Sequence, residues 1–116
     1  MTLRAYQKAQ AAGETPRNAE YRLFGQVTGA LMDAHSAGAK GRPLVEAIDW
    51  NRRLWSTLAV DCMDDGNRLP KILRAQIVSL SLWVSKYSGE VVREGAPLEP
   101  LIDINRTIMQ GLQPAA

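Results

Sequence analysis

The side chains best suited to chemistry gather in one short stretch, 58-LAVDCMDDGNR-68, where the single cysteine stands among three aspartates. A cysteine becomes a nucleophile when neighbouring cations lower the pKa of its thiol, and no cation cluster adjoins Cys62. We therefore interpret Cys62 as a small buried side chain. Asp64 and Asp65 could begin a calcium loop, but 68-RLP-70 interrupts the alternating oxygen ligands that such a loop requires. The pattern favours a solvated turn.

The single histidine, His35, falls near the end of a predicted helix, where the helix dipole favours a cation. No second histidine is available for a metal site or a catalytic pair. One cysteine excludes both an internal disulfide and a zinc site built on cysteines. The motifs GxGxxG, GxxxxGK(S/T) and GxSxG are also missing from the sequence. We therefore expect a protein with no enzymatic activity, no metal and no cofactor.

Size and charge are those of an ordinary globular protein. The 116 residues suit one domain over residues 1–116. The net charge of +2 arises from interspersed signs without a basic block, so a nucleic-acid surface has little support. The longest uncharged run, 75-AQIVSLSLWVS-85, is shorter than the roughly 18 apolar residues of a membrane span. The amino terminus lacks the apolar centre of a signal peptide. We expect a cytoplasmic protein that does not enter a membrane.

Proline and glycine divide the chain into helical segments. Proline is tolerated in a first helical turn, and four prolines each precede a stretch of helical periodicity: Pro16, Pro43, Pro70 and Pro97. The predicted helices lie near residues 3–12, 16–37, 43–63, 70–93 and 98–110. Residues 113–116 are expected to be a disordered tail. The prediction is an all-α, single-domain antiparallel bundle of about four long helices plus a short N-terminal helix.

A helical wheel of the third predicted helix separates its aromatic side chains from its arginines. Trp50 and Trp55 fall on the apolar half, whereas Arg52 and Arg53 fall on the opposite half. Asn51 nevertheless lies near the centre of the apolar half. The segment 102-IDINR-106 repeats the pattern of 48-IDWNR-52, and Asn105 again lies within an apolar stripe. We predict that Asn51 and Asn105 are polar locks that fix helix register or cap a loop such as 64–68, because an unpaired buried amide is costly.

The fourth predicted helix carries apolar residues on two faces, which is typical of a central helix or of one that binds a partner. The face assigned to the core comprises Leu73, Ile77, Leu80, Trp83, Val84, Tyr87 and Val91. Val78, Leu82 and Val92 lie opposite, and Val60 and Met63 lie off the core stripe of the preceding helix. We predict a partner-binding groove formed by Val78, Leu82, Val60 and Met63, with Arg53 at its rim. The same patch would also suit a homodimer.

An RNA-binding regulator is the other class that the residues leave open. It would use cations that are close in sequence, namely Arg52, Arg53, Arg68, Lys71 and Arg74. Single-stranded RNA is usually bound by stacking its bases on exposed aromatic rings, and the wheel assigns these rings to the core. The sequence therefore favours binding of a partner helix over binding of RNA.

Four segments in this order and spacing resemble the FlaF family of flagellum biosynthesis proteins. They are 16-PRNAEYRLFGQVTGAL-31, 49-DWNRRLWSTLAVDC-62, 66-GNRLPKILRAQIVSLSLWVS-85 and 101-LIDINRTIMQGL-112. The resemblance implies a cytoplasmic protein that binds flagellin as a secretion chaperone and works with FlbT, a companion regulator of flagellin translation. It supplies no catalytic residues. An RNA-binding regulator of flagellin mRNA and a purely homodimeric structural module are the alternatives.

Overall fold

The computed structural model describes residues 16–112, which form four α-helices and, within that range, no strand. The helices are α2 (Pro16–Ser36), α3 (Arg42–Cys62), α4 (Lys71–Glu94) and α5 (Glu99–Leu112). The predicted all-α class is confirmed, and each helix begins and ends within two residues of its predicted position. The predicted helix near 3–12 and the predicted tail at 113–116 lie outside the described residues.

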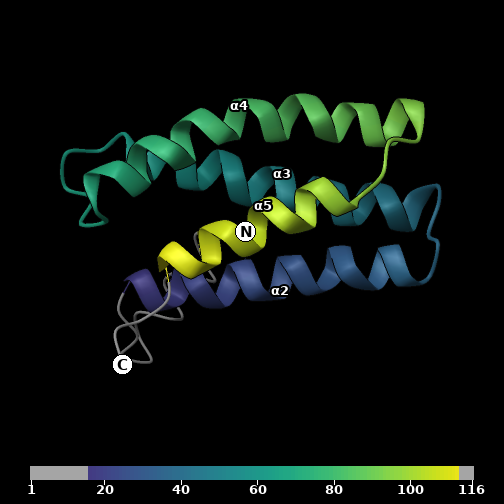
Figure 1. Ribbon diagram of the computed structural model, residues 1–116, viewed down its shortest axis with the longest axis horizontal. Helices are drawn as coiled ribbons and strands as arrows, with labels where there is room; N and C mark the ends of the chain where they lie inside the picture. The colour runs from purple at the N-terminus through teal and green to yellow at the C-terminus, as the bar shows by residue number, and fades with distance from the viewer. Residues whose placement is uncertain (1–15, 113–116) are drawn as a thin grey trace.

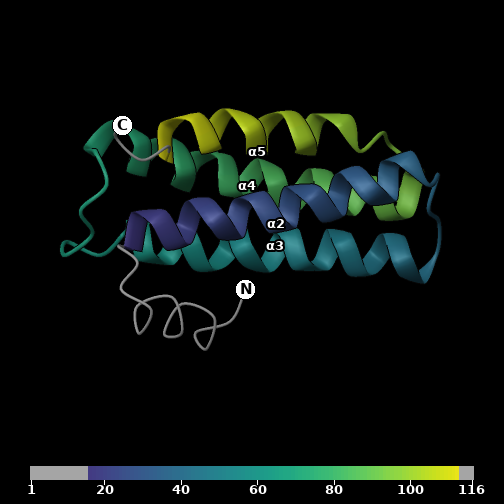
Figure 2. The ribbon, with the colours of Figure 1, turned by 90° about the horizontal axis from the view of Figure 1, so that it is seen from below.

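The four helices form an antiparallel bundle in which each helix packs beside the one that precedes it (Figure 1). α5 returns to lie along α2 and meets α4 over a smaller area. Viewed from below, α5 and α3 lie on opposite sides of the bundle, with α2 in front of α4 (Figure 2). The start of α2, the end of α3 and the start of α4 share one end of the bundle (Figure 1).

Local sequence sets where the helices begin and end. Pro43 occupies the first turn of α3, where a missing N–H costs nothing. α4 ends at Gly95, whose φ of 71° lies in the left-handed region that glycine enters without strain. This conformation lets the Ala96 N–H donate to the Glu90 carbonyl at 3.4 Å, which satisfies one of the free carbonyls at the helix end.

The core lies along the axis of the bundle and is dominated by aliphatic side chains around one aromatic pair. Trp55 and Phe24 meet edge to face, with ring centroids 5.6 Å apart and planes at 89°, an arrangement that aromatic pairs prefer. Trp50 is half-buried and packs against the rim of the same core. The expectation that tryptophans of α3 face inward therefore holds fully for Trp55 and partly for Trp50.

The assignment of Trp83 to the core face of α4 was wrong. Its side chain is 37% exposed and stacks on Tyr87, with ring centroids 4.9 Å apart and planes at 13°. Trp83 adjoins Val84, which is fully buried. Consecutive residues of a helix project about 100° apart, so Trp83 lies at the edge of the apolar stripe rather than at its centre.

Candidate protein-binding surface

Large apolar side chains are exposed on the outer side of the α3–α4 pair. The exposed fraction is 63% for Val60, 61% for Met63 and 77% for Leu82. Val60 lies in the last turn of α3, and Met63, three residues later, caps that helix in a right-handed helical conformation. Val78 and Leu82 are four residues apart on α4, so each pair shares a helix face. We call these four residues the α3–α4 surface.

Two contacts fix how α3 and α4 lie against each other. Arg52 Nη2 donates to Ser85 Oγ at 3.4 Å, and Arg74 Nε donates to the Cys62 carbonyl at 2.9 Å. The pairs place residues 52–62 of α3 alongside residues 74–85 of α4 in antiparallel register. Val78 and Leu82 are therefore level with the second half of α3, the half that ends in Val60 and Met63.

Val78 differs from its sequence-based assignment to a free face. It is half-buried and packs against the core, because it lies on the flank of α4 that turns toward α3. The structure exposes a different apolar residue of α4, Ile72, at 76%. Sequence reasoning missed Ile72, although its position directly before the core residue Leu73 places it about 100° away from the core direction.

Charges of both signs border the α3–α4 surface. Arg53 Nη2 lies 2.9 Å from Asp49 Oδ2 in an ion pair that is mostly exposed, so it contributes little to stability. At the other end, residues 60–65 carry three aspartates and no cation. Burial raises the pKa of Asp61, and the charge of Asp64 raises it further. The carboxylates therefore repel one another at the end of α3.

The loop between α3 and α4 is held by hydrogen bonds rather than arranged as an ion site. The Arg74 guanidinium donates to the carbonyls of Cys62 at 2.9 Å and Asp64 at 2.8 Å. Asp64 Oδ1 accepts from the Gly66 N–H at 2.9 Å, and Asn67 Oδ1 accepts from the Leu69 N–H at 2.9 Å. Arg74 and Asn67 thus perform the loop-capping role that the sequence had offered as one option for Asn51 or Asn105.

Asn105 joins three helices at the centre of the bundle. Its Oδ1 accepts from Trp55 Nε1–H at 2.8 Å, and its Nδ2 donates to Asn51 Oδ1 at 2.8 Å and to Thr28 Oγ1 at 3.2 Å. Both asparagines are fully buried. Within residues 16–112, Asn51 Nδ2 meets no hydrogen-bond partner. These bonds connect α2, α3 and α5, and the contribution of Thr28 was not foreseen from the sequence.

Cys62 is 3% exposed, and its surroundings oppose ionisation. Burial is the main cause that raises the pKa of the thiol to about 11, and the negative charge of Glu20 adds to it. Arg74 acts in the opposite direction but does not compensate. A thiol in this state is a poor nucleophile.

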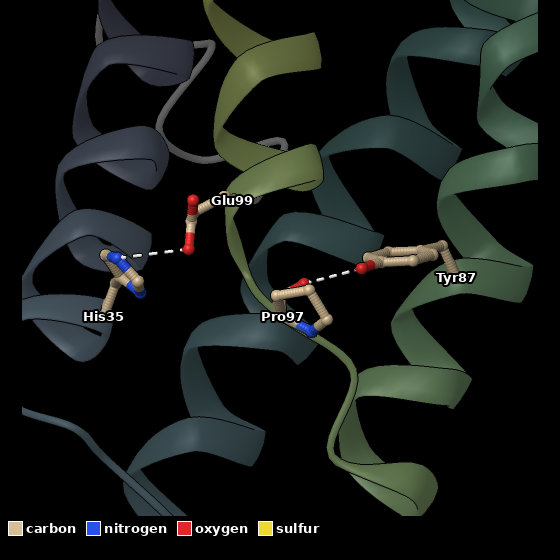
Figure 3. A network of polar contacts seen from close by, with 4 residues as sticks. All are labelled: His35, Tyr87, Pro97 and Glu99. Carbon is tan, nitrogen blue, oxygen red and sulfur yellow. Dashed lines mark hydrogen bonds and ion pairs between the residues drawn. The ribbon is translucent and has the colours of Figure 1, made fainter.

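A second set of polar contacts closes the opposite end of the bundle (Figure 3). His35 Nε2 of α2 lies 3.7 Å from Glu99 Oε1 at the start of α5. The Tyr87 hydroxyl of α4 donates to the Pro97 carbonyl at 2.7 Å. These contacts tie the start of α5 and the segment before it to α2 and α4.

Residues 16–112 contain neither a cluster of metal-ligating side chains nor a helix that could span a membrane. No three side chains of His, Cys, Asp or Glu in this range lie close enough together to hold a metal ion. None of the four described helices contains an apolar stretch that is long enough to cross a bilayer.

Comparison with known proteins places the chain in one family. The model of the family described as flagellar protein FlaF matches residues 2–112. Comparison with curated proteins and with solved structures gave no match. The family match includes all four described helices and also residues 2–15, which precede them.

Proposed function

Because the chain belongs to the FlaF family of flagellar proteins, we propose that it binds flagellin in the cytoplasm as a non-catalytic secretion chaperone. The α3–α4 surface is the proposed binding site. The observation that carries the proposal is the exposure of Val60, Met63 and Leu82, each by more than 60%, on two adjoining helices. Single exposed apolar residues are ordinary, but several on one face are typical of protein interaction sites.

An amphipathic helix is the partner that fits this surface best. Two antiparallel helices present a long, narrow apolar strip, and a third helix can lie along it with anchors at i, i+3, i+4 and i+7. Met63 adds an unbranched, adaptable side chain that suits varied partner surfaces. The terminal segments of flagellin form such helices in the filament. Arg53 and Asp49 at the border would favour the correct register through charge.

Binding in this way would keep flagellin from assembling before export. Burial of apolar surface supplies most of the affinity, and the same surface of flagellin is then no longer free to polymerise. A protein that senses free flagellin can also support the control of flagellin synthesis. FlbT is the proposed companion in that role.

The test is calorimetric titration of flagellin terminal fragments into full-length Leu82→Glu. We expect the affinity to fall by about tenfold or more, the range of a central apolar contact, while the circular dichroism spectrum stays helical, because Leu82 is 77% exposed. Gln76→Glu, an exposed position on the same helix, is the matched control and should bind like the wild type. Equal binding by Leu82→Glu and the control would contradict the proposed site.

RNA binding remains the second candidate, because the structure exposes Trp83, which the sequence had assigned to the core. Trp83 and Tyr87 stack at the edge of α4, and exposed rings can stack on bases. Against this, Arg74 is bonded to the Cys62 and Asp64 carbonyls, and Arg53 is paired with Asp49. Flagellin retained on tagged protein after RNase treatment supports the chaperone proposal, whereas a complex lost with RNase supports RNA.

A homodimer through the α3–α4 surface is tested by sedimentation of the free protein. If the surface binds flagellin and not a second copy, we expect wild type and Leu82→Glu to sediment with the same molecular mass at concentrations below those used for titration. A dimer that Leu82→Glu converts to a monomer would instead assign the surface to a second copy of the chain.

A further inference from the structure

The end of the bundle where α2 begins carries an apolar and acidic surface. Val60 and Met63 lie at the end of α3, and Ile72 lies in the first turn of α4, with exposed fractions between 61% and 76%. Asp61, Asp64 and Asp65 lie next to Val60 and Met63 in the sequence and are all exposed, and with the exposed Arg68 and Lys71 they give residues 60–72 one net negative charge. We call Val60, Met63 and Ile72 the end surface; it shares Val60 and Met63 with the α3–α4 surface.

The fifteen residues that precede α2 have the complementary chemistry. In the sequence MTLRAYQKAQAAGET, helical periodicity over 3–12 puts Leu3 and Tyr6 on one side and Arg4 and Lys8 on the other. This segment carries two positively charged side chains, Arg4 and Lys8, before its first acidic residue, Glu14. Its apolar side chains can pack on the apolar residues of the end surface, and its positive charges are opposite in sign to the neighbouring aspartates.

The connection at Pro16 places these residues within reach. α2 begins at the same end of the bundle as α3 ends (Figure 1). A helix over 3–12 would be about 15 Å long, and the three-residue connection 13–15 can span up to roughly 14 Å from residue 12 to Pro16. The described bundle is only 28 × 25 Å across its two shorter axes, so no part of the end surface is beyond reach.

We propose that residues 1–15 dock on the end surface of the same chain, with Leu3 and Tyr6 against Val60 and Met63. Arg4 and Lys8 face the aspartates of residues 61–65. The docked segment covers part of the α3–α4 surface and competes with the flagellin helix for it. The docking itself is independent of the proposed function, whereas the competition rests on it. The family match includes residues 2–15, so the segment belongs to the same unit as the helices.

Methionine methyl NMR of the full-length protein, without flagellin, tests the docking. The chain has four methionines: Met1, Met32, Met63 and Met109. We expect a nuclear Overhauser contact between the Tyr6 ring and the Met63 methyl group in the wild type. The double variant Leu3→Asp/Tyr6→Asp should move the Met63 signal to the position of a solvated methionine. Met32 and Met109 should not move, which shows that the bundle stays folded.

Ala5→Asp/Ala9→Asp is the matched control, since it adds the same two charges on the side of the predicted helix that faces away from both the Leu3–Tyr6 side and the Arg4–Lys8 side, and it should leave the Met63 signal in place. A Met63 signal that is identical in wild type and double variant, without a contact to Tyr6, overturns the docking. A contact between Tyr6 and Met63 that grows with protein concentration also overturns docking within one chain, because the end surface is then occupied by a second copy of the protein.

Titration with a flagellin terminal fragment tests the competition. If the segment covers the surface about nine-tenths of the time, the double variant should bind about tenfold more tightly than the wild type. Equal affinities would overturn the competition. Absence of binding to every fragment by both proteins would contradict the proposed function, and the NMR result would still decide whether the segment docks.

Discussion

Replacing Asn105 with leucine measures how strongly the fold depends on the buried hydrogen bonds at the centre of the bundle. Asn105 accepts from Trp55 Nε1–H and donates to Asn51 Oδ1, both at 2.8 Å. Leucine has the same branched shape and the same number of side-chain heavy atoms, with bulkier methyl groups in place of the amide, so the change removes the bonds without opening a cavity. It leaves Trp55 Nε1–H and Asn51 Oδ1 buried without partners.

Each orphaned buried polar group costs about 1–3 kcal/mol. Two such groups give an expected loss of about 4 kcal/mol in the free energy of unfolding, a large part of the roughly 5–15 kcal/mol typical of a domain. Asn51→Leu should behave differently. It removes an amide whose Nδ2 has no partner within residues 16–112, while Asn105 Nδ2 keeps Thr28 Oγ1 at 3.2 Å. Its expected cost is about 1 kcal/mol or less.

Urea denaturation followed by far-ultraviolet circular dichroism gives these free energies, because tryptophan fluorescence would itself respond to the change at Trp55. The double variant completes the cycle. Asn51→Leu added to Asn105→Leu should restore about 1–3 kcal/mol, because it removes the orphaned Asn51 amide. The reasoning is refuted if Asn51→Leu alone costs as much as Asn105→Leu, or if the double variant loses the sum of the two.

Three further changes probe other parts of the bundle. Arg74→Gln should lower the free energy of unfolding by about 1–2 kcal/mol, because the charged donor to the Cys62 and Asp64 carbonyls is lost; urea denaturation measures this, and faster amide exchange in residues 62–67 should accompany it. Burial raises the pKa of the Cys62 thiol from 9.0 to about 11, so the thiol ionises at lower pH in the unfolded chain than in the folded protein. The stability that the buried thiol contributes is therefore complete below pH 9.0 and is lost as pH rises toward about 11. Stability curves of wild type and Cys62→Ala should therefore converge with rising pH, and parallel curves would contradict the burial argument. Gly29→Ala should raise the free energy of unfolding by about 0.5–1 kcal/mol, since among the described residues no side chain lies within 4 Å of the added methyl group. Gly111→Ala should gain less, because its methyl group would lie 2.9 Å from Leu73 Cδ1.

Local signals were sufficient to predict the helices. Proline in a first turn and glycine at a helix end act through the backbone of a few residues, so their effect does not depend on the rest of the chain. This is why the positions of Pro43 and Gly95 located the start of α3 and the end of α4. The direction of Asn51 and Asn105 is also local, since a wheel gives the side of the helix on which each lies.

The contacts between helices could not be predicted in the same way. A wheel gives a direction around one helix axis, but it does not say which neighbour is met there or how wide the buried stripe is. Trp83 and Val78 were misplaced for this reason, since both lie at the edges of the stripe of α4. The contact of Arg74 with the α3 carbonyls depends on the register of two helices, which no pattern within either helix specifies. Whether the α3–α4 surface binds a partner remains a prediction.

The buried hydrogen bonds tie α2, α3 and α5 together at fixed donor and acceptor positions. α4 takes no part in these bonds and is held by apolar packing and by polar contacts nearer the surface, including Arg52 with Ser85, Arg74 with the Cys62 and Asp64 carbonyls, and Tyr87 with the Pro97 carbonyl. Apolar packing has no preferred direction, so a helix held in this way tolerates small sliding and rotation that a hydrogen-bonded one resists. The positions of α2, α3 and α5 are therefore set by directional bonds in the interior, whereas the position of α4 depends on packing and on bonds that water can reach. We expect α4, which carries Leu82, to be the helix that shifts when a partner binds there.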